Sequence, residues 1–321
     1  MLVRCFTMTG NFFGKCLGKI VRCFRQRSEL YVFGSSILWG QGHARPEKVG
    51  TKVAEWIEGR FGERVKLHLL AHSGALLTGD PEGGVKRCHG EVPTPWPSIS
   101  AQVRSAQRPH SEKVRILIEG GINDVGGGEI SNPMTAPEYL LSATEAACYV
   151  KMKEVLREIS NRFPDAEIYV IGYYQILADG AKTGDVKEML REEGMPSDEM
   201  EGDDFNFRER AVENSQRFRE LSDYWIAKAA KEIAVDHPGI CEFVASGFES
   251  WEGMFGVPTL VFKPWSRDPM RGKRAKHCAL AVARGQTGLH CFLAATAHPN
   301  TEGTARYVSR ITAAMEGNAG R

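Results

Sequence analysis

Short apolar runs alternate with amphipathic segments along the chain from Glu29 onward. Five runs rich in branched and aromatic residues predict β-strands, at Leu30–Phe33, Val65–Leu70, Val114–Glu119, Glu167–Gly172 and Ile240–Ala245. Segments with a helical repeat follow or separate them, at Glu47–Phe61, Ser98–Gln107, Pro137–Phe163, Arg208–Ala234 and Asn300–Ala314. Strands that alternate with helices in this way predict a parallel sheet covered by helices on both faces, in a single α/β sandwich.

Two stretches depart from this alternation. Gly184–Asp204 contains nine acidic and two basic residues, which predicts a solvated insertion. Gly247–Gly288 is rich in glycine, proline, lysine and arginine and is too long for a simple connection. Such a segment in a compact domain is typical of a lid or a binding loop.

The first 28 residues have a composition of their own, with six basic residues and no acidic one. Wound as a helix, they place apolar side chains on one face and basic ones opposite, as in a helix that lies on a membrane surface. An arginine-rich start without acids is also typical of an organellar transit peptide, and a loose extension is the third reading. We therefore divide the chain into a basic N-terminal extension, residues 1–28, and one domain, residues 29–317.

The composition bears on which binding partners the chain can have. The 321 residues carry 41 Lys plus Arg against 40 Asp plus Glu, so no overall charge drives the chain towards nucleic acid. No apolar stretch approaches the ~18 residues of a membrane helix. The eight cysteines form no CxxC pair, which argues against a zinc ribbon, although Cys278 and Cys291 flank a loop and are candidates for a disulfide. We expect no nucleic-acid partner and no transmembrane segment. The cytoplasm is the favoured compartment, and contact of residues 1–28 with a membrane surface stays open.

Polar and small residues follow the predicted strands at the points where each ends. Gly34–Gly40 follows the first strand, Gly74 the second and Gly121–Asp124 the third, and His298–Asn300 precedes the last helix. The carboxyl ends of parallel strands meet at one edge of a sheet, which is where such folds bind ligands. A serine, a glycine, an asparagine and a histidine are therefore expected on one rim.

In this order the four segments resemble the SGNH (GDSL-type) hydrolase family, whose name spells those four residues. The family's Gly-Asp-Ser block matches Gly34, Ser36 and Gly40, with Ser35 in place of the aspartate. Its Gly-x-Asn-Asp block matches Gly121, Asn123 and Asp124. The resemblance covers residues 29–317 and implies a three-layer α/β/α sandwich around a five-stranded parallel sheet in flavodoxin-like order.

The resemblance also implies a serine esterase that hydrolyses small-molecule carboxylic esters through an acyl-enzyme, with no cofactor and no metal. Ser36 would be the nucleophile and His298 the base. The backbone N–H groups of Ser36 and Gly74 and the side-chain amide of Asn123 would form the oxyanion hole. Two alternatives stay open, an acyltransferase that uses the same site and a decayed SGNH-fold binding protein.

One position departs from the family's pattern, because Ala295 stands where the family places an aspartate three residues before the histidine. That aspartate would fix the histidine tautomer. A backbone carbonyl near Ala295 can replace it in a Ser–His dyad, and Asp268 is the alternative carboxylate. With no carboxylate beside it, His298 is expected to titrate near the ordinary ~6.5 of imidazole.

Each candidate also has a plain structural reading. Ser35 and Ser36 fit a helix cap, and Asn123 and Asp124 fit a turn after a strand. The segment from His298 to Asn300 fits an ordinary helix start.

Other candidate chemistry is weaker. His68 and His72 are four residues apart, but they fall on a predicted strand with no third ligand, so no metal site is expected. Trp39, Trp96 and Tyr173 are candidates for an acyl pocket or for the core. The chain has no Gly-x-Ser-x-Gly elbow and no P-loop.

Overall fold

A computed structural model describes residues 26–79, 90–192, 206–263, 270–282 and 294–319. Most of the basic extension, residues 1–25, lies outside this part of the chain, and so does Asp268. The predictions about that extension and its boundary with the domain therefore stay predictions. None of the helices in the described ranges is long and apolar enough to cross a bilayer.

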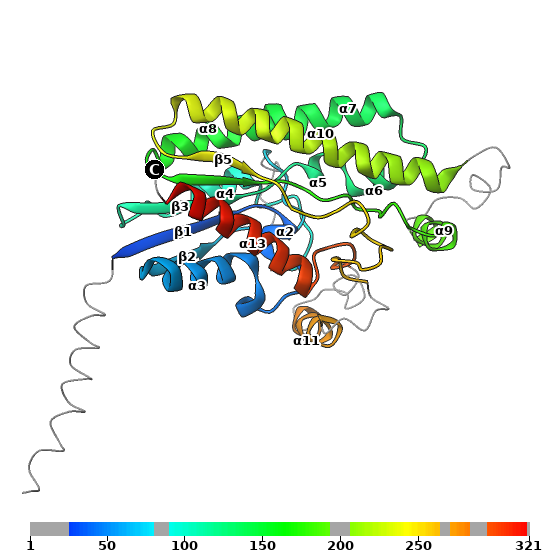
Figure 1. Cartoon of the computed structure of the whole chain (residues 1–321), viewed down its shortest axis with the longest axis horizontal. Coiled ribbons are helices and arrows are strands. Elements are labelled where there is room, and N and C mark those ends of the chain that lie inside the picture. Colours follow the sequence, from blue (N-terminus) through cyan, green and yellow to red (C-terminus); the bar gives the residue numbers. More distant parts are fainter. Residues whose placement is uncertain (1–25, 80–89, 193–205, 264–269, 283–293, 320–321) are drawn as a thin grey trace, which may run out of the picture.

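A five-stranded sheet forms the centre of the molecule (Figure 1). Its strands are β1 (Arg27–Phe33), β2 (Arg64–Leu69), β3 (Lys113–Ile118), β4 (Glu167–Ile171) and β5 (Cys241–Val244). They lie in the order β2-β1-β3-β4-β5, and every neighbouring pair is parallel. The predicted parallel, flavodoxin-like sheet is confirmed.

The first strand begins three residues earlier than its apolar run predicted. Ser28 and Glu29 are polar and yet only 1% and 2% exposed. Glu29 can be buried there because its carboxylate accepts bonds from the backbone N–H of His110, at 2.6 Å, and from the hydroxyl of Tyr31, at 3.0 Å. Hydrophobicity alone therefore placed the start of β1 too late.

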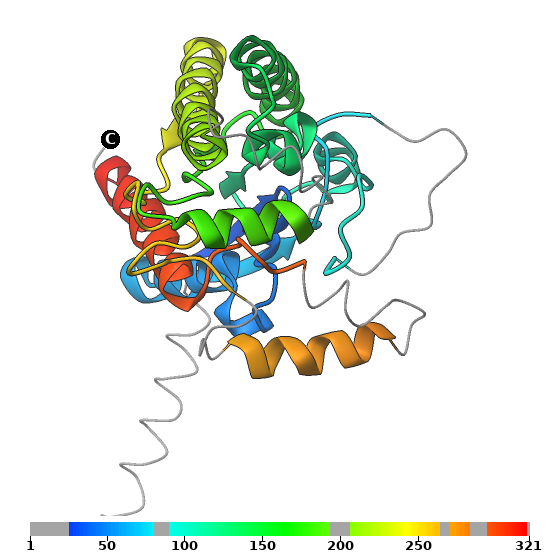
Figure 2. The ribbon, with the colours of Figure 1, turned by 90° about the vertical axis from the view of Figure 1, so that its right-hand side faces the viewer.

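Helices cover both faces of the sheet and give the expected three layers (Figures 1 and 2). One layer holds α4 (Ile99–Ser105), α7 (Pro137–Glu145), the π-helical turn η2 (Ala146–Lys151), α8 (Met152–Arg162) and α10 (Phe207–Asp236). The other holds α3 (Val49–Phe61) and α13 (Thr301–Asn318), which pack on each other. Strands β1, β3 and β4 are almost wholly buried between these layers, as central parallel strands usually are.

The remaining elements gather around the carboxyl ends of the strands. They are α2 (Ser36–Trp39), η1 (Arg45–Glu47), α5 (Ile122–Val125), α6 (Gly127–Ser131), α9 (Thr183–Glu192) and α11 (Met270–Val282). Figure 2 looks at this end of the molecule, with α9 (green) in front of the sheet and α11 (orange) below it. The loops and short helices after the strands therefore form one rim.

The two irregular stretches contain more structure than the sequence predicted. Within the acidic stretch, α9 buries Val186, Met189 and Leu190, so the prediction of a solvated insertion is wrong for this helix. These three apolar side chains lie on one helical face, and the acids occupy the other positions. The second stretch contains α11, whose Cys278 is disulfide-bonded. Cys291 lies outside the described residues, so the predicted pairing stays a prediction.

Candidate active site

Ser36 and His298 meet at the carboxyl end of the sheet, although 262 residues separate them. Ser36 is the first residue of α2, directly after β1, and His298 lies in the turn before α13. The Ser36 Oγ is 2.6 Å from the His298 Nε2. This is the hydrogen bond through which an imidazole takes the proton of a nucleophilic hydroxyl.

The other ring nitrogen of His298 faces a backbone carbonyl. Its Nδ1 is 3.0 Å from the carbonyl oxygen of Thr296, which can only accept a hydrogen bond. The proton therefore belongs on Nδ1, and the lone pair of Nε2 is left to accept the Ser36 proton. No carboxylate in the described segments bonds the ring. Ala295, at the position of the family's aspartate, is fully buried against Phe262 and Met270.

The surroundings of His298 disfavour a positive charge on its ring. Its pKa is lowered from 6.5 to about 4, mainly by burial and to a smaller extent by the nearby Arg274 guanidinium, against opposing effects that raise it. Those opposing effects come from the carbonyls of Thr296 and Ala295 and from Glu91. The expectation of an ordinary imidazole value is therefore wrong. That expectation included the missing carboxylate but not the loss of water around the buried imidazolium ring.

Three donors are expected to bind an oxyanion, and the residues of two of them, Ser36 and Asn123, line one pocket. In the described structure neither the Ser36 nor the Gly74 backbone N–H has an acceptor. The Asn123 amide donates one hydrogen to the carbonyl of Ala75, at 3.1 Å, and has a second to offer. This bond joins the end of β3 to the turn that carries Gly74. The same turn is joined to the end of β1 by a 3.0 Å bond from the His72 N–H to the Gly34 carbonyl.

Gly74 is a position that only glycine fits. Its φ is +78°, and a Cβ there would lie 2.6 Å from the backbone nitrogen of Thr94. The backbone of this turn can therefore approach its neighbours more closely than a side chain would allow. Gly74 is not among the residues that line the pocket described below, although its neighbour Ala75 is bonded to the pocket residue Asn123.

We predict that Asn123→Ala lowers kcat by roughly two to three orders of magnitude, because one aimed oxyanion donor is worth about that much. KM should change much less, since the bond strengthens only as charge develops on the substrate oxygen. The check is steady-state kinetics together with thermal unfolding, because the variant also loses the bond to Ala75. A variant with lowered stability and an unchanged kcat would return Asn123 to a purely structural role.

Two neighbours of the site serve the fold. Asp124 accepts bonds from the Leu77 N–H, at 3.0 Å, and from Lys151, at 2.8 Å. Ser35 precedes α2 but makes no side-chain cap bond. Its hydroxyl instead donates to the carboxylate of Glu119, at 2.9 Å, and its backbone N–H reaches the same group at 2.6 Å.

Glu119 is a buried acid that the sequence reading missed. It follows β3 directly, is fully buried, and also accepts a 3.0 Å bond from the hydroxyl of Tyr173. Burial raises its pKa, while the surrounding donors act in the opposite direction. An aspartate at position 35, as in the family, would face this carboxylate, whereas the serine donates to it. A charged residue at the end of a buried strand was the available signal.

A pocket of about 430 Å³ opens onto Ser36, Asn123 and His298. Apolar side chains supply most of its remaining wall, from α2, α5, α9, the loops after β4 and β5 and the turn before α13. They are Ile37, Ile122, Ile176, Met189, Met254, Ala294 and Ala297. None of its described lining residues is an acid, a lysine or an arginine. Of the aromatic candidates, Trp39, Trp96 and Tyr173 are absent from this lining and Tyr174 is present.

The two histidines considered as metal ligands have other contacts. The His68 Nε2 is 2.7 Å from the Glu29 carboxylate, and its ring stacks on Tyr31 with the centroids 4.2 Å apart. The Nδ1 of His72 lies 2.9 Å from the carbonyl of Ser73. In the residues that the structure covers, no three His, Cys, Asp or Glu side chains gather as a metal site would require.

Comparison with known proteins rests on structure, since no family model and no curated relative matches the sequence. An extracellular lipase from Streptomyces rimosus is similar over 90% of this chain and 99% of its own, at 14% identity and a TM-score of 0.50. The chain has the SGNH hydrolase fold. A phospholipase A1 from Streptomyces albidoflavus covers 89% of the chain and 98% of its own, at 12% identity and a TM-score of 0.48.

A further SGNH-fold neighbour is described as a putative arylesterase from Agrobacterium tumefaciens. It covers 90% of this chain and 99% of its own, at 12% identity and a TM-score of 0.42. At such identities the likeness concerns the fold, and the roles of individual residues depend on the geometry of the site itself.

Proposed function

We propose that this protein is a serine esterase that hydrolyses carboxylic esters through an acyl-enzyme on Ser36. The observation that supports this most is the 2.6 Å contact between the Ser36 Oγ and the His298 Nε2, with Nδ1 held by the Thr296 carbonyl. A serine hydroxyl is a weak nucleophile unless a base removes its proton, and this tautomer of His298 can do so.

In the proposed reaction, His298 takes the Ser36 proton on Nε2 as Oγ attacks the ester carbonyl carbon. The carbonyl oxygen becomes an oxyanion, and the N–H groups of Ser36 and Gly74 with the Asn123 amide stabilise it. His298 then returns the proton to the leaving alcohol as the C–O bond breaks. A water molecule repeats both steps on the acyl-enzyme, which releases the acid and restores Ser36.

His298 would perform this cycle without the carboxylate of a triad. The Thr296 carbonyl fixes the tautomer, which is one of the two tasks of such a carboxylate. Stabilising the imidazolium is the other, and burial opposes it here. His298 is therefore neutral and able to accept a proton even at low pH, but it binds that proton weakly.

The pocket favours an apolar acyl chain of moderate length over a polar or charged group. Its volume of about 430 Å³ is near the small end of ligand pockets. At ~30 Å³ per small group it has room for roughly a dozen heavy atoms, of which the ester itself takes several. With apolar walls and no charged side chain among its described lining residues, it would gain roughly 0.8 kcal/mol for each methylene that it buries.

We predict that p-nitrophenyl esters from acetyl to palmitoyl give the highest kcat/KM at butyryl to octanoyl. Met189 lines the pocket from α9, so Met189→Trp should move the optimum towards acetyl. Met134→Trp is the matched control, because Met134 is 51% exposed and is not part of the pocket lining. An optimum at palmitoyl, or one that Met189→Trp does not move, would contradict this assignment of the pocket.

Acyl transfer is a second outcome of the same chemistry, because the acyl-enzyme can react with an alcohol in place of water. Adding an alcohol acceptor to the assay and measuring ester against free acid separates the two. A decayed binding protein is the remaining alternative. The hydrogen bonds of Ser35 to Glu119 argue against reading that position as decay.

A further inference from the structure

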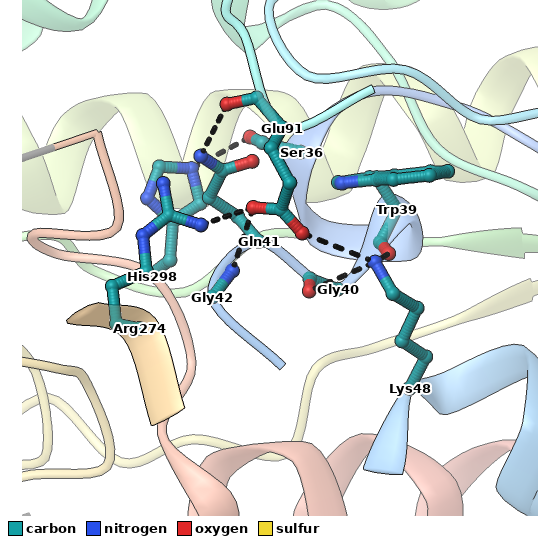
Figure 3. A network of polar contacts seen from close by, with 9 residues as sticks. All are labelled: Ser36, Trp39, Gly40, Gln41, Gly42, Lys48, Glu91, Arg274 and His298. Carbon is teal, nitrogen blue, oxygen red and sulfur yellow. Dashed lines mark hydrogen bonds and ion pairs between the residues drawn. The ribbon is translucent and has the colours of Figure 1, made fainter. Parts of the chain in front are cut away.

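Three charged side chains from distant parts of the chain are buried together beside the site (Figure 3). Lys48, Glu91 and Arg274 are each less than 5% exposed. The Glu91 carboxylate lies between the two cations, paired with Arg274 on one oxygen and 3.4 Å from Lys48 on the other. Burying three charges is costly, so the arrangement calls for a reason beyond stability.

The cluster of Lys48, Glu91 and Arg274 forms hydrogen bonds with the backbone and side chain of the residues that follow Ser36. Lys48 donates to the carbonyl of Trp39, at 2.6 Å, and also reaches the carbonyl of Gly40, at 3.4 Å. These are among the last carbonyls of α2, the helix that begins with Ser36, and a cation at a helix C-terminus is favourable. On the other side, Glu91 accepts the Gly42 N–H at 3.3 Å and, through its backbone carbonyl, the Gln41 amide at 3.0 Å.

The same turn, residues 39–43, touches the segment that carries His298. Gly42 has φ +87°, and a Cβ there would lie 3.2 Å from the Cβ of Ala295 and 2.8 Å from the Cε of Met270. The ring of His43 is 3.0 Å from the carbonyl of Pro299. The turn is therefore a spacer between the nucleophile and the base, and the charge cluster holds it from two sides.

We infer that Lys48, Glu91 and Arg274 are positioning residues for the Ser36–His298 pair, with Arg274 as the cation that opposes a second positive charge on the His298 ring. The inference rests on the proposed function, in which His298 is the base. Glu91 partly offsets Arg274, and Lys48 holds Glu91 in place. Burial is the main cause that keeps the base unprotonated, and Arg274 adds to it at a position where no carboxylate of the described segments bonds the ring.

The two charged groups that act on the ring, Arg274 and Glu91, and the Lys48 that holds Glu91 come from three different elements. Arg274 belongs to α11, Glu91 to the loop before α4, and Lys48 to the turn before α3. The Ser36 hydroxyl and the carbonyls of Ala295 and Thr296 are the neutral polar groups around it. Removing Arg274 should therefore make His298 easier to protonate, and removing the charge of Glu91 should make it harder.

Removing the charge of Arg274 and removing that of Glu91 should thus have opposite effects on the protonation of His298. Residues that only stabilise the fold would not show this opposition. In the full chain, Arg274→Met should move the acid limb of kcat/KM upward by roughly half a pH unit or more. Glu91→Gln should lower kcat with no upward movement of that limb. Arg274→Lys, which keeps the charge, should keep the limb near its wild-type position. If Arg274→Met does not fold, Arg274→Gln also removes the charge and replaces it in this test.

The His298 ring should also be titrated by NMR, assigned through its absence in His298→Asn, because this readout does not depend on turnover. An upward shift of the ring titration in Arg274→Met supports the inference even if no ester is hydrolysed, a result that would count against the proposed function alone. Arg115→Met is the control: it removes a buried arginine paired with Glu63 at 2.7 Å, while Lys113 stays 3.0 Å from that carboxylate. Equal shifts in both variants, or none in Arg274→Met, would overturn the inference.

Discussion

Replacing Ser36 with alanine is expected to lower kcat/KM for p-nitrophenyl butyrate by roughly four to six orders of magnitude, as loss of a serine nucleophile does elsewhere. Ser35→Ala should retain most of the activity. The Ser35 hydroxyl points to Glu119, whereas the Ser36 hydroxyl points to His298. Steady-state kinetics on the two variants, with circular dichroism to show that both fold, measures the difference.

The comparison is well controlled, because the same substitution is made at two adjacent serines whose hydroxyls have different partners. Ser35→Ala removes one donor from a buried carboxylate, which still accepts from the Ser35 and Leu38 N–H groups and from Tyr173. A stability loss of about 1 kcal/mol with retained turnover is therefore expected. An inactive Ser35→Ala beside an active Ser36→Ala would show that the nucleophile is assigned one residue too late.

The second large effect concerns His298 and pH. His298→Ala should lose roughly four or more orders of magnitude in kcat/KM at every pH, because no other group in this account removes the Ser36 proton. In the wild type only neutral imidazole can act as the base. Since burial lowers the pKa of His298 to about 4, kcat/KM should rise with pH through that value and be level from weakly acid to neutral pH.

The control for this prediction is His68→Ala. The His68 ring bonds Glu29 and stacks on Tyr31, so its loss should affect stability and leave the pH profile unchanged. A wild-type profile that rises near pH 6.5, the ordinary value for histidine, would mean that the site is more hydrated than its geometry implies. Retained activity in His298→Ala would remove His298 from the mechanism altogether.

The sequence predicted the parts of this molecule that depend on local pattern. The parallel direction of the strands followed from apolar runs that alternate with helical repeats, and their order followed from the resemblance to SGNH hydrolases. Ser36, Asn123 and His298 were found because they directly follow strands or precede a helix, where a parallel sheet gathers its site. Gly74 was found in the same way, and its positive φ shows why glycine stands there.

What the sequence could not predict depends on contacts between distant segments or on the backbone. A backbone carbonyl near Ala295 was expected to face the His298 Nδ1, but the sequence did not indicate that Thr296 would supply it, because every residue has a carbonyl. Lys48, Glu91 and Arg274 come together only after folding, and nothing in their local sequence indicates it. The lowered pKa of His298 follows from burial in the finished fold, and Met189 reaches the pocket only because α9 docks with its apolar face inward.

The most direct test of the central claim is labelling of the intact protein with a fluorophosphonate probe at neutral pH, followed by peptide mass spectrometry. The probe reacts only with a serine that a neighbouring base activates. We expect one adduct, on Ser36, which Ser36→Ala abolishes, Ser35→Ala preserves and His298→Ala forms much more slowly. A folded protein that takes no label, or that is labelled on another serine, would contradict it.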